Sequence, residues 1–237
     1  MFYFDIIASY SIIFAAAIGI IRFKKIHKSY RPFVIICIVA LLNETISYLS
    51  IYTFGNNEIN NNIYSLVEAI LYLWLFRGWG VFGRGPFLFM ACLLSVIWIV
   101  NNLVSKYIAD SSFRFLTIYS CTLVFFAITE INRIVMSGRG NLFRDSRFLI
   151  CAGIVIFYTY TSIVGIFWIT QLNLSTAFYS NLYMVLQSVN ILINLVFALA
   201  VLWAPQRLRF ILRFDCRCRY RHISRVFYYR YSATAKK

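Results

Sequence analysis

Long apolar stretches alternate with short polar segments along the chain. Seven of these stretches are each close to the ~20 residues that a helix needs to cross the hydrocarbon core of a membrane. Because lipid offers no partners to open backbone groups, each stretch is predicted to be an α-helix. The pattern therefore predicts an all-α, integral membrane seven-helix bundle over residues 1–205 and a basic tail over residues 206–237. The predicted spans are residues 4–22, 33–54, 63–83, 87–108, 113–136, 147–170 and 178–203.

Lysine and arginine gather in every second connection between these spans and in the tail. Of the 23 basic residues, only Lys106 and Arg114 lie in the other connections. Basic flanks are retained in the cytoplasm, so the pattern predicts an N-terminus outside and a cytoplasmic C-terminus. Anionic headgroups at the cytoplasmic face of the lipid bilayer are the expected partner of the tail. The tail residues expected to meet them are Arg207, Arg209, Arg213, Arg217, Arg219 and Arg221.

Composition also indicates a membrane protein. Hydrophobic residues make up 61% of the chain and charged residues 13%, against about 45–50% and about 25% in soluble globular domains. In a soluble protein a net charge of +15 would suggest a nucleic-acid partner. Here the charge lies in loops and a tail beside the membrane, so we expect no nucleic acid to bind.

Three carboxylates fall inside predicted spans. A charge at the centre of a membrane costs at least ~2.5 kcal/mol on insertion scales, so each one needs a physical explanation. Glu130 has Arg133 one helical turn away, and we expect the two to form an interfacial pair. Glu44 and Glu68 have no basic residue at helical spacing in their own spans. These two glutamates are therefore the strongest functional candidates.

Other polar side chains share helix faces with the two glutamates or lie at a similar depth. Most of them fall in the outer half of the bundle, which suggests a polar pocket that opens outward and is lined by the second, third, fourth and seventh spans. The alternative is a set of hydrogen bonds between helices, each worth about 0.6–2 kcal/mol. The candidate ligand-binding residues are Glu44, Glu68, Tyr48, Tyr64, Tyr72, Asn101, Asn102, Tyr183, Gln187 and Asn190.

The residue inventory argues against several chemistries. No span interior carries the lysine that a retinal protein needs. The only histidines, His27 and His222, lie in predicted cytoplasmic segments, so no imidazole is available at membrane depth as a zinc ligand or base. An acid–base pair of Glu44 and Glu68 would need a third group that the sequence does not reveal. We expect a protein without a cofactor that is not an enzyme.

A short internal echo suggests a further level of organisation. Residues 62–68 (Asn-Ile-Tyr-Ser-Leu-Val-Glu) open the third span, and residues 181–187 (Asn-Leu-Tyr-Met-Val-Leu-Gln) open the seventh in the same direction. Three spans, a linker span and three more spans would produce this relationship, and transporters with parallel repeats place their site at the repeat interface. A 3+1+3 repeat would pair Glu68 with Gln187 across the bundle centre. The first two spans show no comparable match to the fifth and sixth.

Residues 61–76 resemble the signature of a seven-transmembrane family of Bacteroidota, in which an Asn-Ile-Tyr-x-x-x-Glu-Phe run opens the third span. Residues 42–48 (Leu-Asn-Glu-Thr-Ile-Ser-Tyr) are similar to the acidic centre of that family's second span. The resemblance is clearest over residues 22–76, and Ala69 stands where the family often has phenylalanine. It implies a multi-pass protein of the bacterial inner membrane and marks Glu44 and Glu68. It supplies no substrate.

Three functional hypotheses follow. In the leading one, the chain is a sensor or signalling protein whose outward pocket binds a small ligand, cation or proton and whose basic face contacts a cytoplasmic signalling partner. The first alternative is a small-solute or ion transporter with a 3+1+3 repeat. The second is an oligomerising effector that permeabilises the bilayer, for example in phage defence. A homo-oligomer is compatible with each hypothesis.

Overall fold

The computed structural model describes residues 2–104, 108–137, 141–170 and 175–206. These residues belong to the first of two compact units, Met1–Arg207. The second unit, Leu208–Lys237, lies outside them, and so do the tail arginines that we expect to meet lipid headgroups. Within the described ranges every regular element is a helix, and the β-bridge between Ile26 and Gln206 is isolated.

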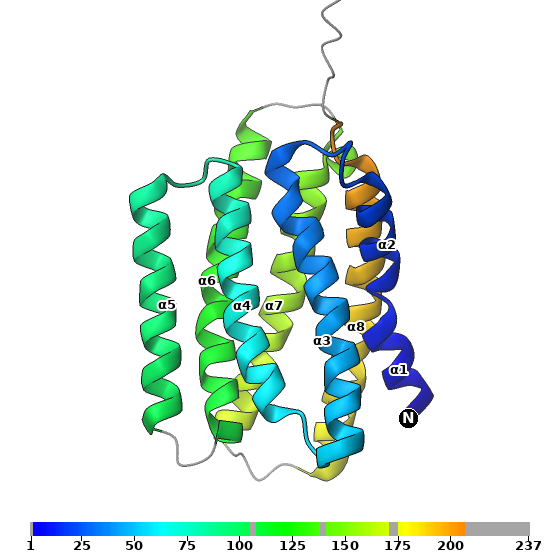
Figure 1. Cartoon of the computed structure of the whole chain (residues 1–237), viewed down its shortest axis with the longest axis vertical. Coiled ribbons are helices and arrows are strands. Elements are labelled where there is room, and N and C mark those ends of the chain that lie inside the picture. Colours follow the sequence, from blue (N-terminus) through cyan, green and yellow to red (C-terminus); the bar gives the residue numbers. More distant parts are fainter. Residues whose placement is uncertain (1, 105–107, 138–140, 171–174, 207–237) are drawn as a thin grey trace, which may run out of the picture. The chain divides into compact units, whose positions relative to one another are not determined.

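Helices follow one another along the described residues; α1 and α2 run in the same direction, and from α2 onward the long helices run in alternating directions (Figure 1). The α-helices are α1 (Phe2–Tyr10), α2 (Ile13–Arg22), α3 (Arg31–Phe54), α4 (Glu58–Gly78), α5 (Arg84–Val104), α6 (Ile108–Met136), α7 (Ser146–Thr170) and α8 (Thr176–Trp203). Two short 3₁₀ helices, η1 (Lys28–Tyr30) and η2 (Leu142–Arg144), precede α3 and α7. The first predicted span is therefore two helices, because the chain turns between α1 and α2.

The ends of α3 show how local sequence sets the helix boundaries. Pro32 lies in the first turn, where its missing N–H has no helical partner to lose. Gly55 follows the last residue with a φ of 77°, a left-handed conformation that glycine adopts without steric cost. The same conformation recurs at Gly80, just after α4, with a φ of 78°. This turn explains why α4 ends at Gly78 and does not continue to the predicted residue 83.

Among the described residues, six helical segments are long and apolar enough to cross a membrane. They are Phe4–Arg22, Lys28–Phe54, Arg84–Asn102, Phe113–Met136, Ser146–Thr170 and Ala177–Trp203. The helix α4 is not among them, although it has 21 residues, like α5. Its polar residues include Asn62 and Glu68, which are only 2% and 9% exposed. The polarity of α4 therefore belongs to the face that it buries inside the bundle.

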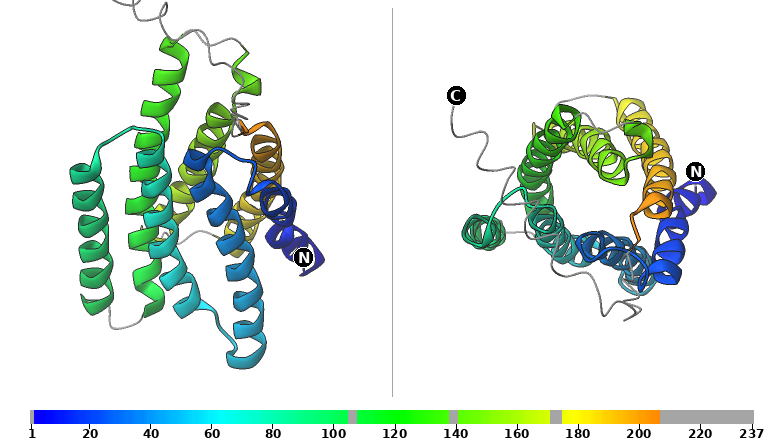
Figure 2. Two further views of the ribbon diagram at one scale, coloured as in Figure 1. Left: turned by 45° about the horizontal axis from the view of Figure 1, so that its top comes forward. Right: turned by 90° about the horizontal axis from the view of Figure 1, so that it is seen from above.

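Six helices form a closed ring in the order α2, α3, α4, α6, α7 and α8, and α8 contacts α2 again. The view along the bundle in Figure 2 shows this ring and places α5 outside it. The helix α5 contacts α4 and α6. Consecutive helices thus lie side by side around the ring, except that the chain leaves it once, through α5.

Glycines allow close helix approach at several ring contacts. A Cβ atom at Gly153 of α7 would lie 2.5 Å from Phe197 Cε1 on α8. A Cβ atom at Gly19 of α2 would lie 2.6 Å from Val34 Cγ1 on α3. Small residues commonly mediate helix contacts inside membranes, because dispersion contacts replace the hydrophobic effect there. These glycines therefore help to set the width of the ring.

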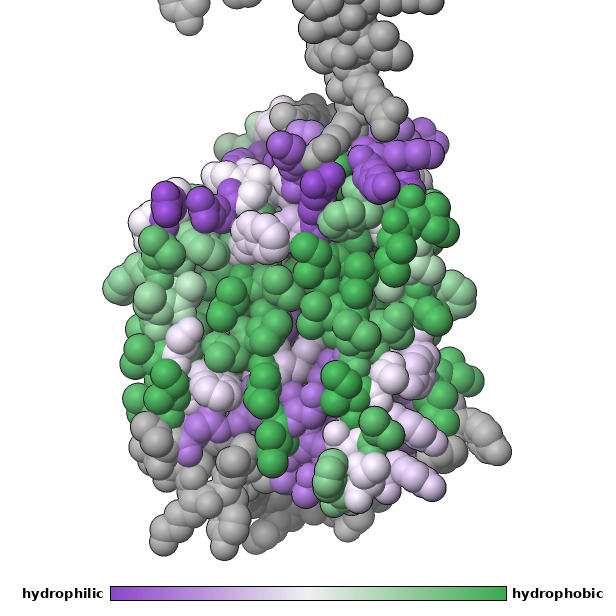
Figure 3. Space-filling model, viewed as in Figure 1, coloured by the Kyte–Doolittle hydropathy of each residue, from purple (hydrophilic) through white to green (hydrophobic). Residues whose placement is uncertain are grey.

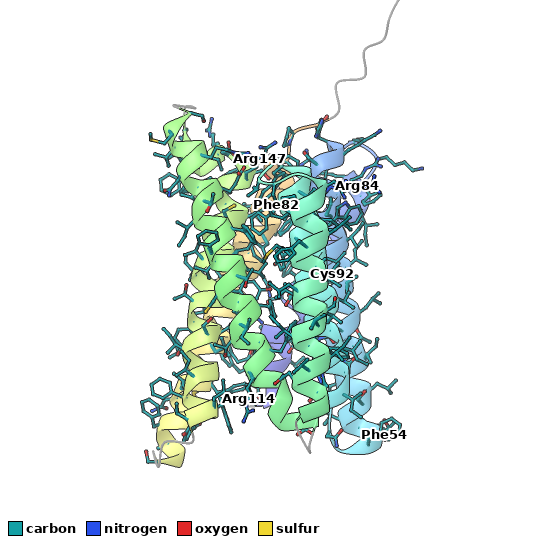
Figure 4. The ribbon with its side chains drawn as sticks, turned by 90° about the vertical axis from the view of Figure 1, so that its left-hand side faces the viewer. Phe54, Phe82, Arg84, Cys92, Arg114 and Arg147 are labelled. Atoms are coloured by element: carbon teal, nitrogen blue, oxygen red, sulfur yellow. The ribbon has the colours of Figure 1, made fainter. Side chains whose placement is uncertain are left out.

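One end of the bundle is basic. Figure 4 shows Arg84 and Arg147 near this end, and Arg114 and Phe54 near the other. In Figure 3 a hydrophilic rim at this end borders a broad hydrophobic belt. We call it the basic end, and we call the end with the α3–α4 connection the opposite end. An apolar belt between two more polar ends is the arrangement that a lipid bilayer requires.

Candidate functional site

A cavity of about 350 Å³ lies inside the ring. Its lining comes from α3, α4, α6, α7 and α8, and from Ser9 of α1 and the following Ile12. Five of the predicted ligand-binding residues line it: Glu44, Tyr64, Glu68, Tyr72 and Asn190. We expected the fourth span to contribute, but the corresponding helix α5 lies outside the ring and provides no lining residue. The fifth and sixth spans contribute in its place, as α6 and α7.

Glu68 is at the middle of α4 and is held by tyrosine hydroxyl groups. The Tyr64 hydroxyl, one turn earlier on the same helix, donates a 2.8 Å hydrogen bond to Glu68 Oε1. The Tyr119 hydroxyl on α6 donates a 2.6 Å hydrogen bond to Glu68 Oε2. Tyr158 on α7 lines the cavity together with Glu68 and these two tyrosines. Each oxygen of the Glu68 carboxyl group therefore has a tyrosine hydroxyl partner from within the bundle.

Aromatic rings surround this carboxylate. The Tyr158 ring meets the Tyr72 ring edge-on at a centroid distance of 5.7 Å and the Tyr119 ring at 5.8 Å. All three tyrosines are 2% exposed. Edge-to-face contacts at these distances are favourable for aromatic pairs. They lock α4, α6 and α7 together around Glu68.

Glu44 lines the same cavity from α3. Its side chain is half-buried, and Ser9 of α1 lines the cavity with it. Glu44 and Glu68 line the same cavity from neighbouring helices of the ring. The structure therefore brings together, from two helices, the two glutamates that the sequence leaves without basic partners.

The turn between α1 and α2 also faces the cavity. The Asn194 side chain of α8 donates a 2.7 Å hydrogen bond to Ser11 Oγ, and Asn190 donates a 3.4 Å hydrogen bond to the Ala8 carbonyl oxygen. An interrupted helix leaves backbone groups without helical partners, and inside a membrane these groups need protein partners. Asn190 supplies such a partner directly. Asn194 holds the Ser11 hydroxyl, which itself donates a 2.6 Å hydrogen bond to the Ala8 carbonyl oxygen. Both asparagines also line the cavity.

Amides and hydroxyl groups form a polar seam between α3 and α4, which consists of Asn43, Ser47, Asn60 and Asn61. The Asn60 side-chain amide donates 2.8 Å hydrogen bonds to Asn43 Oδ1 and to Ser47 Oγ. Ser47 Oγ donates a 3.1 Å hydrogen bond to Asn61 Oδ1. In Figure 3 a hydrophilic strip rises between α3 and α4 from the opposite end into the hydrophobic belt. Because Asn43 and Asn61 also line the cavity, the seam connects the cavity with this surface.

An ion cluster lies near the basic end. Glu130 is 1% exposed and pairs with Arg133 at 2.8 Å, which confirms the predicted pairing of these two residues. Arg147 of α7 lies 3.6 Å from the same carboxylate, a partner that helical spacing alone does not reveal. Arg133 also donates hydrogen bonds to the carbonyl oxygens of Trp79 and Gly80. The cluster therefore joins the ends of α4, α6 and α7.

The other predicted ligand-binding residues lie away from the cavity. Tyr48 is 50% exposed on α3. Asn102 accepts a 2.5 Å hydrogen bond from Asn62, so it ties α5 to α4, as the hydrogen-bond alternative for such residues expects. The last three predicted residues do not line the cavity either: Asn101 lies on α5, and Tyr183 and Gln187 lie on α8. Gln187 donates a 2.5 Å hydrogen bond to the Tyr183 hydroxyl within α8.

Sequence reasoning missed Tyr119 as a site residue. The available signal was its spacing of three helical turns from Glu130, which places both side chains on one face of the same helix. Ala127 and Leu123 lie between them on this face, and both are fully buried. The polar seam was missed as well, although Asn43 and Ser47 belong to the segment 42–48 that was singled out around Glu44.

Comparisons with known proteins do not assign the chain to a family. No protein-family model, no curated protein and no solved structure matches it. Among the described residues, no group of three or more His, Cys, Asp or Glu side chains is placed to hold a metal ion. The resemblance to the Bacteroidota family stays a prediction, and the function is argued below from the cavity itself.

Proposed function

We propose that the chain is a seven-span protein of the bacterial inner membrane that binds a small cationic solute or a proton in the ring cavity and carries it across the membrane. The observation that carries this proposal is the cavity itself, which contains Glu44 and Glu68 at the middle of a closed helix ring. Ionisable side chains at membrane depth are costly, and in membrane proteins they commonly mark the pathways of ions and substrates.

The proposal takes α4 as the seventh span. Its neighbours in the ring are α3 and α6, which both contain segments apolar enough to span. A helix that contacts two spanning helices along its length can carry polar residues on its inner face, because those side chains meet protein and not lipid. The burial of Asn62 and Glu68 supports this interpretation.

The order of the helices in the ring supports a 3+1+3 organisation. The group α2–α3–α4 and the group α6–α7–α8 each occupy half of the ring, and α5 connects them from outside. If α2, α3 and α4 are matched in order with α6, α7 and α8, the α4–α6 contact corresponds to the α8–α2 contact. The contact pattern therefore has twofold symmetry. Transporters with parallel repeats bind their substrate between such halves.

The internal echo fits this organisation only in part. Tyr64 and Glu68 are hydrogen-bonded one turn apart on α4, and Tyr183 and Gln187 are hydrogen-bonded one turn apart on α8. However, Gln187 does not line the cavity opposite Glu68, whereas Asn190 does. The two halves therefore differ in rotation or register about their helix axes. We accordingly propose that α4, which carries Glu68, and not α8 provides the main ligand-binding side chain of the site.

The turn between α1 and α2 gives independent support. Discontinuous helices at membrane depth are a recurrent feature of transporter binding sites, because they expose backbone groups to the substrate pathway. Here the turn lies between Ser9 and Ile12, which both line the cavity together with Glu44.

Reconstitution into proteoliposomes tests the proposal. We expect uptake of at least one of three probes, namely protons, Na⁺ or tetramethylammonium, and we expect Glu68→Gln to reduce it at least tenfold. Glu58→Gln is the matched control, because Glu58 is an exposed carboxylate in the first turn of the same helix. Uptake that is absent for all three probes, or equal in both variants, would overturn the transporter proposal.

A sensor is the second candidate, because one helix connects the cavity to the basic end. Tyr119 contacts Glu68 in the cavity, and three turns further along α6 Glu130 pairs with two arginines. A change at Glu68 would be passed along α6 to a cytoplasmic partner. Binding of a probe that is lost in Glu44→Gln, with no flux in proteoliposomes, would identify a sensor.

A further inference from the structure

The cavity is acidic in a chain that is strongly basic. The net charge of the sequence is +15, but the charged residues that line the cavity are Glu44 and Glu68. None of the described residues that line it is lysine, arginine or histidine. A negative site without an internal counterion attracts a cation, and the low dielectric of the surroundings strengthens the attraction.

The same cavity is rich in aromatic rings. Four phenylalanines line it together with Tyr64, Tyr72, Tyr119 and Tyr158. Ring faces attract cations, and they do so best for organic cations whose charge is spread over carbon-bearing groups. A cavity that combines a carboxylate with several tyrosine rings therefore resembles the aromatic cages that bind quaternary ammonium ions.

Size and ligand supply argue against a bare metal ion as the main ligand. A volume of about 350 Å³ is at the small end of ligand pockets and far larger than a single ion or water molecule needs. Calcium and magnesium require about six oxygen ligands at close range. The oxygens of Glu68 already accept hydrogen bonds from Tyr64 and Tyr119.

We propose that the cavity binds an organic ammonium ion, with its nitrogen beside Glu68 and its carbon groups against the rings of Tyr72, Tyr119 and Tyr158. The proposal names the ligand class of the cavity that carries the proposed function, and it rests on that function only for the location of the site. The phenol hydrogen bonds hold the carboxylate in place, and the rings exclude water from the bound cation.

Binding can be measured on the purified full chain in detergent by thermal unfolding. We expect choline and tetramethylammonium to raise the Tm in a concentration-dependent manner. The neutral isostere of choline, 3,3-dimethylbutan-1-ol, has nearly the same shape without the charge and is expected to leave the Tm unchanged. Equal stabilisation by the alcohol, or by K⁺ at the same concentration, would overturn the proposal.

Variants separate the charge from the rings. Glu68→Gln is expected to weaken choline binding at least tenfold, and Glu58→Gln is the control that keeps binding unchanged. Tyr158→Leu removes a ring face and is expected to weaken binding about 3- to 30-fold. Tyr158→Phe keeps the ring and is expected to bind within about threefold of the original chain, which guards against a folding defect at this position. Equal binding by the Leu and Phe variants would argue against the aromatic cage.

The outcomes also separate this inference from the proposed function. Choline binding without flux of any probe would support the organic ammonium site and overturn transport. Glu68-dependent flux of protons or Na⁺ without choline binding would support transport and overturn the organic ammonium site.

Discussion

The Tyr119 hydroxyl of α6 donates a 2.6 Å hydrogen bond to Glu68 Oε2 of α4 in the interior of the helix ring. The two residues are 51 positions apart in the chain, and both are buried. The contact explains how the bundle accommodates a carboxyl group inside a predicted membrane span. Phenol groups hold both oxygens of Glu68, and none of the described residues that line the cavity is a lysine, arginine or histidine that could pair with it. In the organic ammonium proposal, the cationic ligand takes the place of that missing partner.

Loss of this hydrogen bond should destabilise the protein. Tyr119→Phe keeps the ring but removes the donor, and a hydrogen bond to a charged group is worth about 1.5–3 kcal/mol. We expect the free energy of unfolding in mixed micelles to fall by that amount. The control is Tyr52→Phe, whose side chain is 84% exposed on α3. A decrease no larger than that of the control would show that the contact does not contribute to stability.

The ion cluster near the basic end should be a second determinant of stability. Glu130→Gln leaves Arg133 and Arg147 without the buried carboxylate that now lies 2.8 Å and 3.6 Å from them. Breaking a fully buried pair costs about 3–5 kcal/mol, and we expect about 2–4 kcal/mol because Arg133 is half exposed. Unfolding in mixed micelles measures this loss.

Glu58→Gln again serves as the control for this change, because it removes an exposed carboxylate at the opposite end of the bundle. If both variants lose the same free energy, the cluster has no special role.

Sequence periodicity and charge predict much of this fold. Hydropathy gives the helices, because crossing a membrane imposes one length and one backbone conformation. The i,i+3 spacing predicts the pair of Glu130 and Arg133, because neighbours on one helix are set by helix geometry alone. The absence of basic residues near Glu44 and Glu68 singles out two residues that line one cavity.

Periodicity and charge do not predict which helices, far apart in the sequence, contact one another. Ser11 and Asn194 are 183 residues apart, and a hydrogen bond joins them. Ser11 lies at the break between α1 and α2, and no proline or glycine at this break predicts it from the sequence. Asn102 is as polar as Asn190, yet it faces α4 from outside the ring while Asn190 faces the cavity. Periodicity identifies the polar face of a helix, but it does not identify the neighbour that this face meets.

The polar seam should control access to the cavity. Asn60→Ala removes the amide that bonds Asn43 and Ser47 across the α3–α4 contact. Cys37 lines the cavity and is 1% exposed, so its labelling by a water-soluble methanethiosulfonate reports access. We expect the variant to label Cys37 several-fold faster, because the freed seam groups will recruit water. Mass spectrometry of the peptide that contains Cys37 distinguishes it from the other thiols.

The seam experiment has a matched control in Asn56→Ala, which changes an exposed asparagine in the α3–α4 connection. Faster labelling in both variants would indicate a general loosening of this end of the bundle. An unchanged rate in Asn60→Ala would mean that access to the cavity follows another route.

The crossing of α4 can be decided with alkaline phosphatase fusions, since this enzyme needs disulfides that form only after export from the cytoplasm. A fusion after Asn57, between α3 and α4, should be active, and a fusion after Gly83, between α4 and α5, should be inactive. A fusion after His27, in the basic connection before α3, is the inactive reference. Equal activity after Asn57 and Gly83 would mean that α4 does not cross. Opposite activities would mean that the helix carrying Glu68 spans the membrane, so that its carboxylate lies at the midplane, where a charge requires the phenol donors that surround it.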